Sequence, residues 1–437
     1  SGTLASGTNT GRLIITGRAG GNYTAAAATS TGGGALTLSG AQTAITIPNQ
    51  NGRFEFVNAN FTGASTSYRM YGVDGSNRAF EFDGTTFVPI TSALPVDQPE
   101  HIVEFKKHLF LSESSRVVNS AIGDPYNWTS TAGAAEIGLG EDLTGFQLQP
   151  GATSGGALSM FCRNHTYMFY GTSAADWNLV SYNSESGAIP YTIQKIGQTF
   201  SMDDRGLTSM EAAQEFGNFI QSTVSRRVNT WLRGLRNLAI DSQISRDKQQ
   251  YRLFFSDGSA AYLMVLSDKM SIMPMFFPNV VRCSCSSEQR ASGIEEIYFG
   301  SDSGHVYQMD RGTSFDGADI VANFETAFYN LKSYRALKRF RKITFEVKGS
   351  SYTEFKSSYC LSYSSPETTQ PEENTTISDT GLTQWDTNNW DTFFWDSRNL
   401  IPFSMYMGGN GENISIKISV TGGAYLPIRF SGAFIEY

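Results

Sequence analysis

The residues whose types and spacing are best suited to chemistry are three Trp-Asp pairs in "WDTNNWDTFFWD", residues 385–396, which recur every five positions. Indole rings could stack on a sugar, and the carboxylates could bind hydroxyls or a metal ion. A step of five alternates between the two faces of a strand and turns ~140° on a helix, so the rings form no regular platform. We predict that Trp385, Trp390 and Trp395 anchor a loop on its own domain or an adjacent subunit, with sugar binding as the alternative.

A basic run, "KSYRALKRFRK" at 332–342, holds six Lys or Arg residues interleaved with aromatic residues. Such a pattern can contact nucleic-acid phosphates or an acidic protein surface. Because the chain as a whole is acidic, we favour a protein–protein contact, with Lys338, Arg339 and Arg341 as interface candidates.

The remaining ionisable residues predict no catalytic, metal or cofactor site. The four histidines show no metal-ligand spacing, and we expect His108 and His165 to be solvated in hairpin turns. The adjacent pairs Asp203–Asp204 and Glu295–Glu296 point to opposite faces of a strand, so a glycosidase pair would need carboxylates from separate elements. The arginines near residue 230 are expected to be surface charge; they are Arg226, Arg227, Arg233 and Arg236.

Composition favours an all-β protein. Aromatic residues make up 13% of the 437 residues, charged residues only 17%, and there are 43 glycines. The formal net charge of -8 argues against a general nucleic-acid binder but suits a conduit through which DNA slides without sticking. The four cysteines are expected to be reduced, and no apolar run approaches the ~18 residues of a membrane span.

The chain divides into three segments by pattern. Residues 1–50 are rich in Gly, Ser, Thr and Ala and predict an arm or short platform strands, with "ALTLSG" and "AITIPN" as strand candidates. Residues 51–315 predict hairpin after hairpin, and this density favours a β-propeller of about five to seven blades. Residues 316–437 contain well-alternated strands and predict a C-terminal β-sandwich or jelly-roll-like platform.

Six segments carry the hairpin prediction. Three resemble one another, with an aromatic strand, a turn containing Asp and Gly, and a second strand; they are 70–84, 253–266 and 297–310. The other three are strand pairs around short polar turns; they are 101–113, 157–172 and 217–234. The segment 319–349 marks the boundary to the platform, and its centre is expected to be a short helix or a long edge strand.

One motif resembles a known family. "VVNSAIGDPYNWTST", residues 117–131, follows an aromatic-rich strand pair, and its S-A-x-G-D-P-x-N-W pattern resembles a recurrent blade motif of the tail nozzle or hub family of short-tailed bacteriophages, also called tail tubular protein B. In this motif Gly123, Asp124 and Pro125 would form a sharp turn, and Trp128 would pack between blades. Residues 162–180 and 196–221 are similar to later segments of that family.

The resemblance implies a non-enzymatic virion protein without cofactors, located in the phage tail and assembled in the bacterial host cytoplasm. It implies a homohexameric ring that contacts a tail adaptor or portal-proximal ring and other tail proteins such as a fibre, needle or plug, and encloses the channel for genome exit. The alternative, from a different class, is a carbohydrate-binding or glycan-cleaving β-propeller of the tail.

Overall fold

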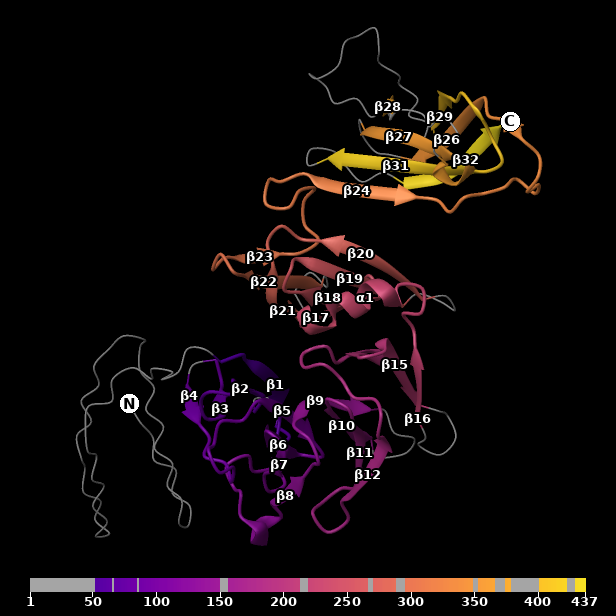
Figure 1. Cartoon of the computed structure of the whole chain (residues 1–437). Coiled ribbons are helices and arrows are strands. Elements are labelled where there is room, and N and C mark those ends of the chain that lie inside the picture. Colours follow the sequence, from indigo (N-terminus) through magenta and orange to yellow (C-terminus); the bar gives the residue numbers. More distant parts are fainter. Residues whose placement is uncertain are drawn as a thin grey trace, which may run out of the picture. The chain divides into compact units, whose positions relative to one another are not determined.

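The computed structural model describes residues 52–64, 67–84, 86–149, 156–212, 219–265, 270–287, 295–348, 353–365, 374–378, 401–422 and 429–437. The chain divides into two compact units, Ser1–Met309 and Asp310–Tyr437, and each is described by itself (Figure 1). Two of the sequence-based predictions lie outside the described residues: the N-terminal arm at 1–50 and the anchors Trp385, Trp390 and Trp395.

The first unit is a series of antiparallel sheets in which each strand pairs with the next one in the chain. Its first three sheets each have four strands. Their strands are β1 (Glu55–Ala59), β2 (Arg69–Val73), β3 (Phe80–Phe82) and β4 (Phe87–Pro89) in sheet 1; β5 (His101–Phe105), β6 (His108–Glu113), β7 (Arg116–Asn119) and β8 (Ala135–Gly138) in sheet 2; and β9 (Leu143–Gln149), β10 (Ala157–Cys162), β11 (Thr166–Tyr170) and β12 (Asn178–Asn183) in sheet 3.

Two further four-stranded sheets and one three-stranded sheet follow. Their strands are β13 (Gln194–Ile196), β14 (Gln198–Asp203), β15 (Gly206–Ala212) and β16 (Phe219–Thr223) in sheet 4; β17 (Ala239–Ser245), β18 (Gln250–Phe255), β19 (Ser259–Met264) and β20 (Ser271–Phe276) in sheet 5; and β21 (Val281–Ser287), β22 (Glu296–Ser301) and β23 (Val306–Gln308) in sheet 6. Short helical segments interrupt the strands; they are η1 (Ser130–Ala132), α1 (Asn229–Leu235) and η2 (Arg236–Leu238).

The three similar hairpins are confirmed as antiparallel pairs, β2–β3, β18–β19 and β22–β23. Local turn chemistry explains the first of them. The Asp74 carboxylate accepts hydrogen bonds from the backbone N–H groups of Ser76 and Asn77 at 3.0 and 2.7 Å. Gly75 adopts a φ of 70°, which a residue with a side chain rarely tolerates.

Successive sheets pack through their first strands and share hydrophobic cores. β5 lies against β1 and β9, and β17 lies against β13 and β21. Buried side chains link sheets 1 and 2, sheets 2 and 3, sheets 3 and 4, and sheets 4 and 5 in turn. Consecutive four-stranded meanders that pack face to face are the building unit of a β-propeller. The unit is therefore all-β with blade-like sheets, and a closed propeller remains a prediction.

One hairpin prediction is wrong in its second half. The segment 217–234 begins with strand β16, but its end forms the helix α1 instead of a second strand. Leu232 is fully buried there, and Trp231 and Leu235 are partly buried against the core of sheets 4 and 5. Leu232 and Leu235 follow Trp231 by one and four positions, so the three side chains lie on one face of a helix. Their packing against the core outweighs the weak preference of Trp for strands.

The second unit is a sandwich of two antiparallel sheets. The larger sheet has the order β24-β31-β27-β28, and the smaller has the order β29-β26-β32. One hydrophobic core lies between them and includes Phe345 of β26, Phe355 of β27 and Ile416 of β31. The elements are β24 (Ile320–Glu325), β25 (Lys338–Arg339), β26 (Lys342–Lys348), β27 (Thr353–Leu361), η3 (Ser362–Ser364), β28 (Asn374–Ser378), β29 (Ile401–Tyr406), β30 (Asn410–Gly411), β31 (Ile414–Gly422) and β32 (Arg429–Glu436).

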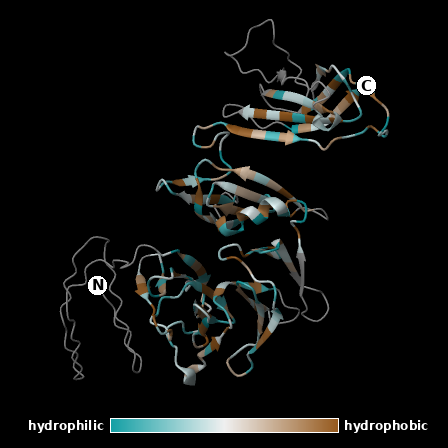
Figure 2. Ribbon diagram, in the orientation of Figure 1, coloured by the Kyte–Doolittle hydropathy of each residue, from teal (hydrophilic) through white to brown (hydrophobic). Residues whose placement is uncertain are grey.

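The centre of the boundary segment 319–349 is neither a helix nor a long edge strand. Within its described residues, 319–348, the edge strand β24 occupies only the beginning, and turns and bends follow as far as the two-residue strand β25. Figure 2 shows hydrophobic residues along β24.

Candidate functional site

Polar residues from the first strands of several sheets meet in the first unit. We name Arg53, Glu55, His101, Tyr191 and Asp241 the first-strand cluster. Arg53 and Glu55 belong to the start of sheet 1, His101 opens β5, Tyr191 precedes β13, and Asp241 lies in β17. Because the first strands of neighbouring sheets pack together, their alternate side chains converge from positions far apart in sequence.

Arg53 is the centre of this cluster. Its Nη2 donates to Asp241 Oδ1 at 2.6 Å, and its Nη1 donates to the carbonyl oxygen of Ile240. The guanidinium carbon lies 3.5 Å from the centre of the Tyr191 ring, which is a cation–π contact. One side chain thus connects the beginning of sheet 1 with sheets 4 and 5.

Asp241 is buried, and its second carboxylate oxygen accepts a hydrogen bond from Ser284 Oγ of β21. The same carboxylate therefore links sheets 1, 5 and 6. Burial raises the pKa of Asp241 to about 7, although Arg53 and Ser284 act in the opposite direction by favouring the charged form.

His101 and Glu55 form a second ion pair. The His101 Nδ1 lies 2.9 Å from Glu55 Oε1, and the imidazole centre lies 6.0 Å from that of Tyr191. Burial lowers the pKa of His101, but the neighbouring Glu55 carboxylate outweighs this, so the net pKa is raised from 6.5. The two charge pairs thus join sheets 1, 2 and 5, and the Tyr191 ring contact and the Ser284 hydrogen bond add sheets 4 and 6.

Both titrating groups predict a first unit that is less stable in alkali. The folded state holds the Asp241 proton between pH 3.8 and about 7, where the unfolded state has released it. The raised pKa of His101 likewise contributes stability that is full below pH 6.5 and is lost as the pH rises through the folded-state pKa.

We therefore expect the free energy of unfolding to fall from about pH 4 to pH 8, through Asp241 up to about pH 7 and through His101 above pH 6.5, by up to about 1.4 kcal/mol per pH unit for each group. Denaturant titrations of the wild-type chain and of Asp241→Asn at several pH values measure this. Asp241→Asn should show only the part of this decrease in the free energy of unfolding that is due to His101. A wild-type stability that rises toward pH 8 would contradict the assignment.

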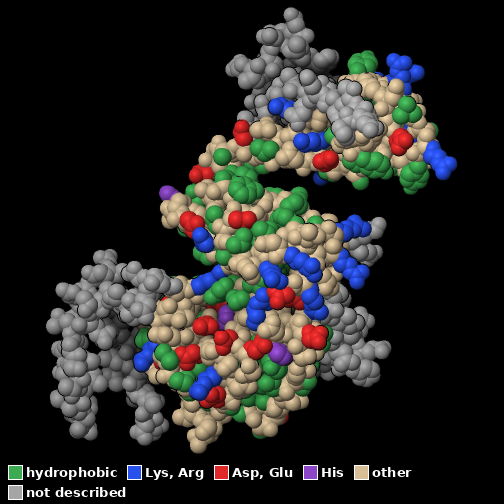
Figure 3. Space-filling model, viewed as in Figure 1, with side chains coloured by type: hydrophobic (Ala, Val, Ile, Leu, Met, Phe, Trp, Pro, Cys, Tyr) green, Lys and Arg blue, Asp and Glu red, His purple; other side chains and the backbone are tan. Residues whose placement is uncertain are grey.

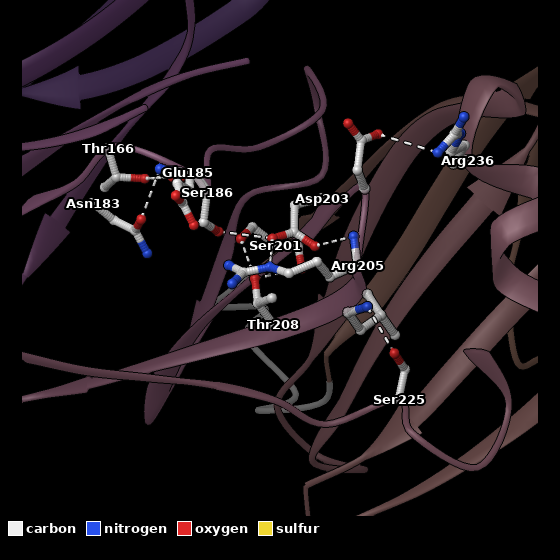
Figure 4. Close-up of polar contacts among 12 residues, drawn as sticks. Thr166, Asn183, Glu185, Ser186, Ser201, Asp203, Arg205, Thr208, Ser225 and Arg236 are labelled. Atoms are coloured by element: carbon white, nitrogen blue, oxygen red, sulfur yellow. Dashed lines mark hydrogen bonds and ion pairs between the residues drawn. The ribbon is translucent and has the colours of Figure 1, made fainter. Parts of the chain in front are cut away.

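A second polar cluster joins sheets 3 and 4 around Asp203 (Figure 4). Asp203 Oδ2 accepts from Ser186 Oγ at 2.7 Å and from Arg205 Nε at 3.0 Å, and its Oδ1 accepts from the Arg205 backbone N–H at 2.8 Å. Thr166 Oγ1 of β11 donates to the Ser186 carbonyl oxygen at 2.8 Å. These hydrogen bonds attach the segment that connects sheets 3 and 4 to both sheets.

The paired carboxylates singled out in the sequence have separate structural partners. Asp204 is exposed and forms ion pairs with Arg163 at 2.6 Å and with Arg236 at 3.7 Å. Glu295 accepts from Ser245 Oγ and from two backbone N–H groups of the β17–β18 turn. Glu296 accepts from the hydroxyl of Tyr298. Each of these carboxylates thus ties strands or turns together.

The basic-run candidates occupy different environments. Lys338 is 6% exposed, and its Nζ donates to the carbonyl oxygens of Ser333, Ala336 and Glu412 at 2.7, 3.1 and 2.8 Å. Its charge therefore stabilises the backbone within the second unit. Arg339 and Arg341 are exposed and remain available to a partner.

The Gly123–Asp124–Pro125 turn lies beside the core of sheets 1 and 2. Gly123 has a φ of 71° and donates its N–H to the Lys107 carbonyl oxygen at 2.8 Å, while Asp124 Oδ1 accepts from the Tyr126 N–H at 3.1 Å. Trp128 is partly buried against that core. This geometry gives the motif a packing role between two sheets.

One expectation about the histidines is wrong. His108 is 1% exposed, and its Nδ1 lies 2.6 Å from the Ser120 carbonyl oxygen. The tight turn takes Lys106 and Lys107, both with positive φ, so His108 already belongs to the buried strand β6. In the described ranges no group of three or more His, Cys, Asp or Glu side chains could hold a metal ion.

The four cysteines are free thiols, with Cys283 and Cys285 exposed on the same face of β21. Across the described part of the chain, no helix is long and apolar enough to cross a membrane.

Sequence reasoning missed the first-strand cluster. Its one local signal is Asp241, a lone carboxylate within the otherwise uncharged strand sequence "AIDSQIS". A charge at a buried strand position requires a partner, but nothing near it in the sequence identifies Arg53, 188 positions away. The cluster can hold sheets together by charge.

Comparisons with known proteins add little. No family model matches the chain, and no curated protein matches it. Among solved structures, two of BBS1N in complex with ARL6DN, soaked with lead or with mercury, are 12% and 10% identical. Each alignment covers 58% of this chain and 90% of that chain, with TM-scores of 0.33 and 0.31, and a likeness this low supports no functional argument.

Proposed function

We propose that the chain is a virion structural protein of the tail nozzle or hub type. In this proposal it forms a homohexameric ring in the tail of a short-tailed phage, next to an adaptor or portal-proximal ring. The resemblance of residues 117–131 to a blade motif of that family supports it, together with the succession of meander sheets and the separate sandwich unit. The net charge of -8 suits a channel that does not retain DNA.

The observation that carries the proposal is an exposed apolar edge strand in the second unit. Val321 and Phe324 of β24 are 59% and 61% exposed. They differ by an odd number of positions, so they project from opposite faces of the strand. An edge strand with large apolar side chains on both faces is a site for pairing with another chain, and soluble monomers usually protect such edges.

Exposed residues of the basic run offer a second contact surface in the second unit. Arg339 and Arg341 follow Tyr334 and Leu337, which are 75% and 68% exposed. On the visible face of the second unit, hydrophobic, basic and acidic side chains are interspersed (Figure 3). A basic and aromatic surface in an acidic chain is complementary to acidic surfaces of neighbouring copies or tail proteins.

Replacing Phe324 with Glu should abolish ring formation while leaving the fold intact, because a charge would have to be buried in the subunit contact. Phe276→Glu is the matched control, since Phe276 is 63% exposed on β20 of the first unit. Electron microscopy of the purified proteins measures the outcome. Six-fold rings for the wild-type chain and for the control, and none for Phe324→Glu, are expected.

Two results would overturn the proposal. One is a wild-type chain that stays monomeric and hydrolyses or tightly binds a polysaccharide, which is the behaviour of a carbohydrate-active propeller. The other is a ring that forms equally well with Phe324→Glu, which would leave assembly without the contact argued here.

A further inference from the structure

Sheet 1 has one buried face and one aromatic face. Tyr71 and Val73 point toward sheet 2 and are buried in the core that the two sheets share. On the opposite face lie five phenylalanine rings, which we name the aromatic face: Phe54, Phe56, Phe80, Phe82 and Phe87. Phe54 and Phe56 are stacked with ring centres 5.7 Å apart, and Phe80 and Phe87 are stacked at 4.5 Å.

This face is partly open. Phe54 and Phe56 are 40% and 54% exposed, whereas Phe80 beneath them is 7% exposed. Gly72 lies between them, and a Cβ added there would come within 2.4 Å of the Phe80 ring. The backbone of β2 thus makes room for a close-packed aromatic layer, the kind of surface that normally lies under another sheet.

Sheet 6, the last in the series, has a comparable open face. Ile297 and Phe299 are buried on one side, and the Phe299 ring lies 6.3 Å from that of Phe277 at the end of sheet 5. On the opposite side Cys283 and Cys285 are exposed, and Val306 is 74% exposed. The first and last sheets of the series therefore each expose one face.

These two sheets approach each other at their first strands. Arg53, at the start of sheet 1, and Ser284, in the first strand of sheet 6, both bind the Asp241 carboxylate. The series of sheets consequently curves back on itself, as a propeller does. The described chain begins at Gly52, beside this junction and two residues before Phe54.

We propose that the aromatic face docks the chain's own N-terminal segment, residues 1–50. Continuity supports this occupant, because the segment runs directly into Arg53 and Phe54. Its length is sufficient, because sheet 1 extends only from Glu55 to Pro89. Its charged residues are only Arg12 and Arg18, and it offers alternate apolar residues for an aromatic layer: Leu36, Leu38, Ile45 and Ile47.

Hydrogen exchange of the full chain, followed by mass spectrometry, tests this inference, which does not depend on the proposed function. Residues 35–47 should exchange at least about tenfold more slowly than an unstructured peptide. Phe56→Ser should remove most of that protection. Phe276→Ser is the control, because it alters an equally exposed phenylalanine and should leave the protection unchanged.

Photo-cross-linking of an equal mixture of isotope-labelled and unlabelled chains, both with photo-leucine incorporated at leucine positions such as Leu36 and Leu38, distinguishes the occupants. Links between residues 1–50 and sheet 1 or sheet 6 should join residues of one isotopic type only. Links between labelled and unlabelled chains would show that a second copy supplies the segment, and would overturn the inference. Unprotected residues 35–47 in the wild-type chain would overturn it as well. If Phe56→Ser unfolds sheet 1, as exchange of residues 69–82 would reveal, Phe54→Ser replaces it.

Discussion

At pH 8, where Asp241 is ionised in the wild-type chain, replacing Arg53 with Ala should lower the free energy of unfolding of the first unit by about 3–5 kcal/mol, because the change leaves a buried carboxylate without its cation. The Asp241 side chain is 7% exposed, and Arg53 Nη2 lies 2.6 Å from it. The variant also loses the hydrogen bond to the Ile240 carbonyl oxygen and the contact with the Tyr191 ring. Denaturant unfolding of the wild-type and variant chains measures the loss.

Two further variants show whether the buried charge is the cause. In Arg53→Ala/Asp241→Asn an uncharged amide replaces the carboxylate, so the double variant should be more stable than Arg53→Ala alone. Arg116→Ala is the matched control, because Arg116 and Glu136 are 51% and 54% exposed and their ion pair should contribute less than about 1 kcal/mol. Equal losses for Arg53→Ala and Arg116→Ala would refute the role of the cluster.

The parts of the fold that were predictable from the sequence are those with local causes. The hairpins at 70–84 and 253–266 form because Asp and Gly residues in the turns satisfy and bend the backbone within a few positions; Asp257, for example, accepts the Ser259 N–H at 2.9 Å. Alternating strands near the C-terminus likewise indicate a sandwich, because one face of each must be buried.

Two of the wrong predictions concern features that a local sequence pattern does not reveal: tertiary packing for the helix α1, and the register of a turn for His108. Residues 229–235 became the helix α1 because Leu232 has a buried site between sheets 4 and 5. The position of His108 depended on one residue of turn register, since a turn at Lys106 and Lys107 places the next side chain in the strand. A single-residue shift of this kind exchanges the two faces of a strand.

The candidate site could not be predicted, for a related reason. Arg53 and Asp241 belong to different sheets, and their meeting depends on how the whole series curves. The sequence instead drew attention to groups with conspicuous local patterns, such as the basic run. There, Lys338 binds backbone carbonyls within its own unit, and only its neighbours Arg339 and Arg341 face solvent. Local charge density thus identifies a surface but not which of its residues are free to bind.

Gly187→Ala is expected to have an effect of similar size, about 3 kcal/mol, at the upper end of what overpacking costs. Gly187 lies in the connection from β12 to β13, where a Cβ would come within 2.0 Å of the Cys162 carbonyl oxygen and 2.6 Å of the Arg163 backbone. Ala188 donates its N–H to the same Cys162 oxygen at 2.9 Å, so the clash also threatens that bond. Because the added Cβ would clash with backbone atoms, no side-chain rotation relieves the clash.

Gly138→Ala is the control, because a Cβ at Gly138 in β8 meets no atom within 4 Å. It should leave stability within about 1 kcal/mol of the wild type. Cys162 offers a second measurement beside denaturant unfolding. The wild-type thiol is fully buried, and burial raises its pKa to about 12, which keeps it unreactive. Gly187→Ala should make Cys162 accessible to thiol reagents, as sheets 3 and 4 separate, and Gly138→Ala should not. Similar stability and thiol reactivity in the two variants would mean that the connection yields without loosening the two sheets, and that their contact is less rigid than its hydrogen bonds indicate.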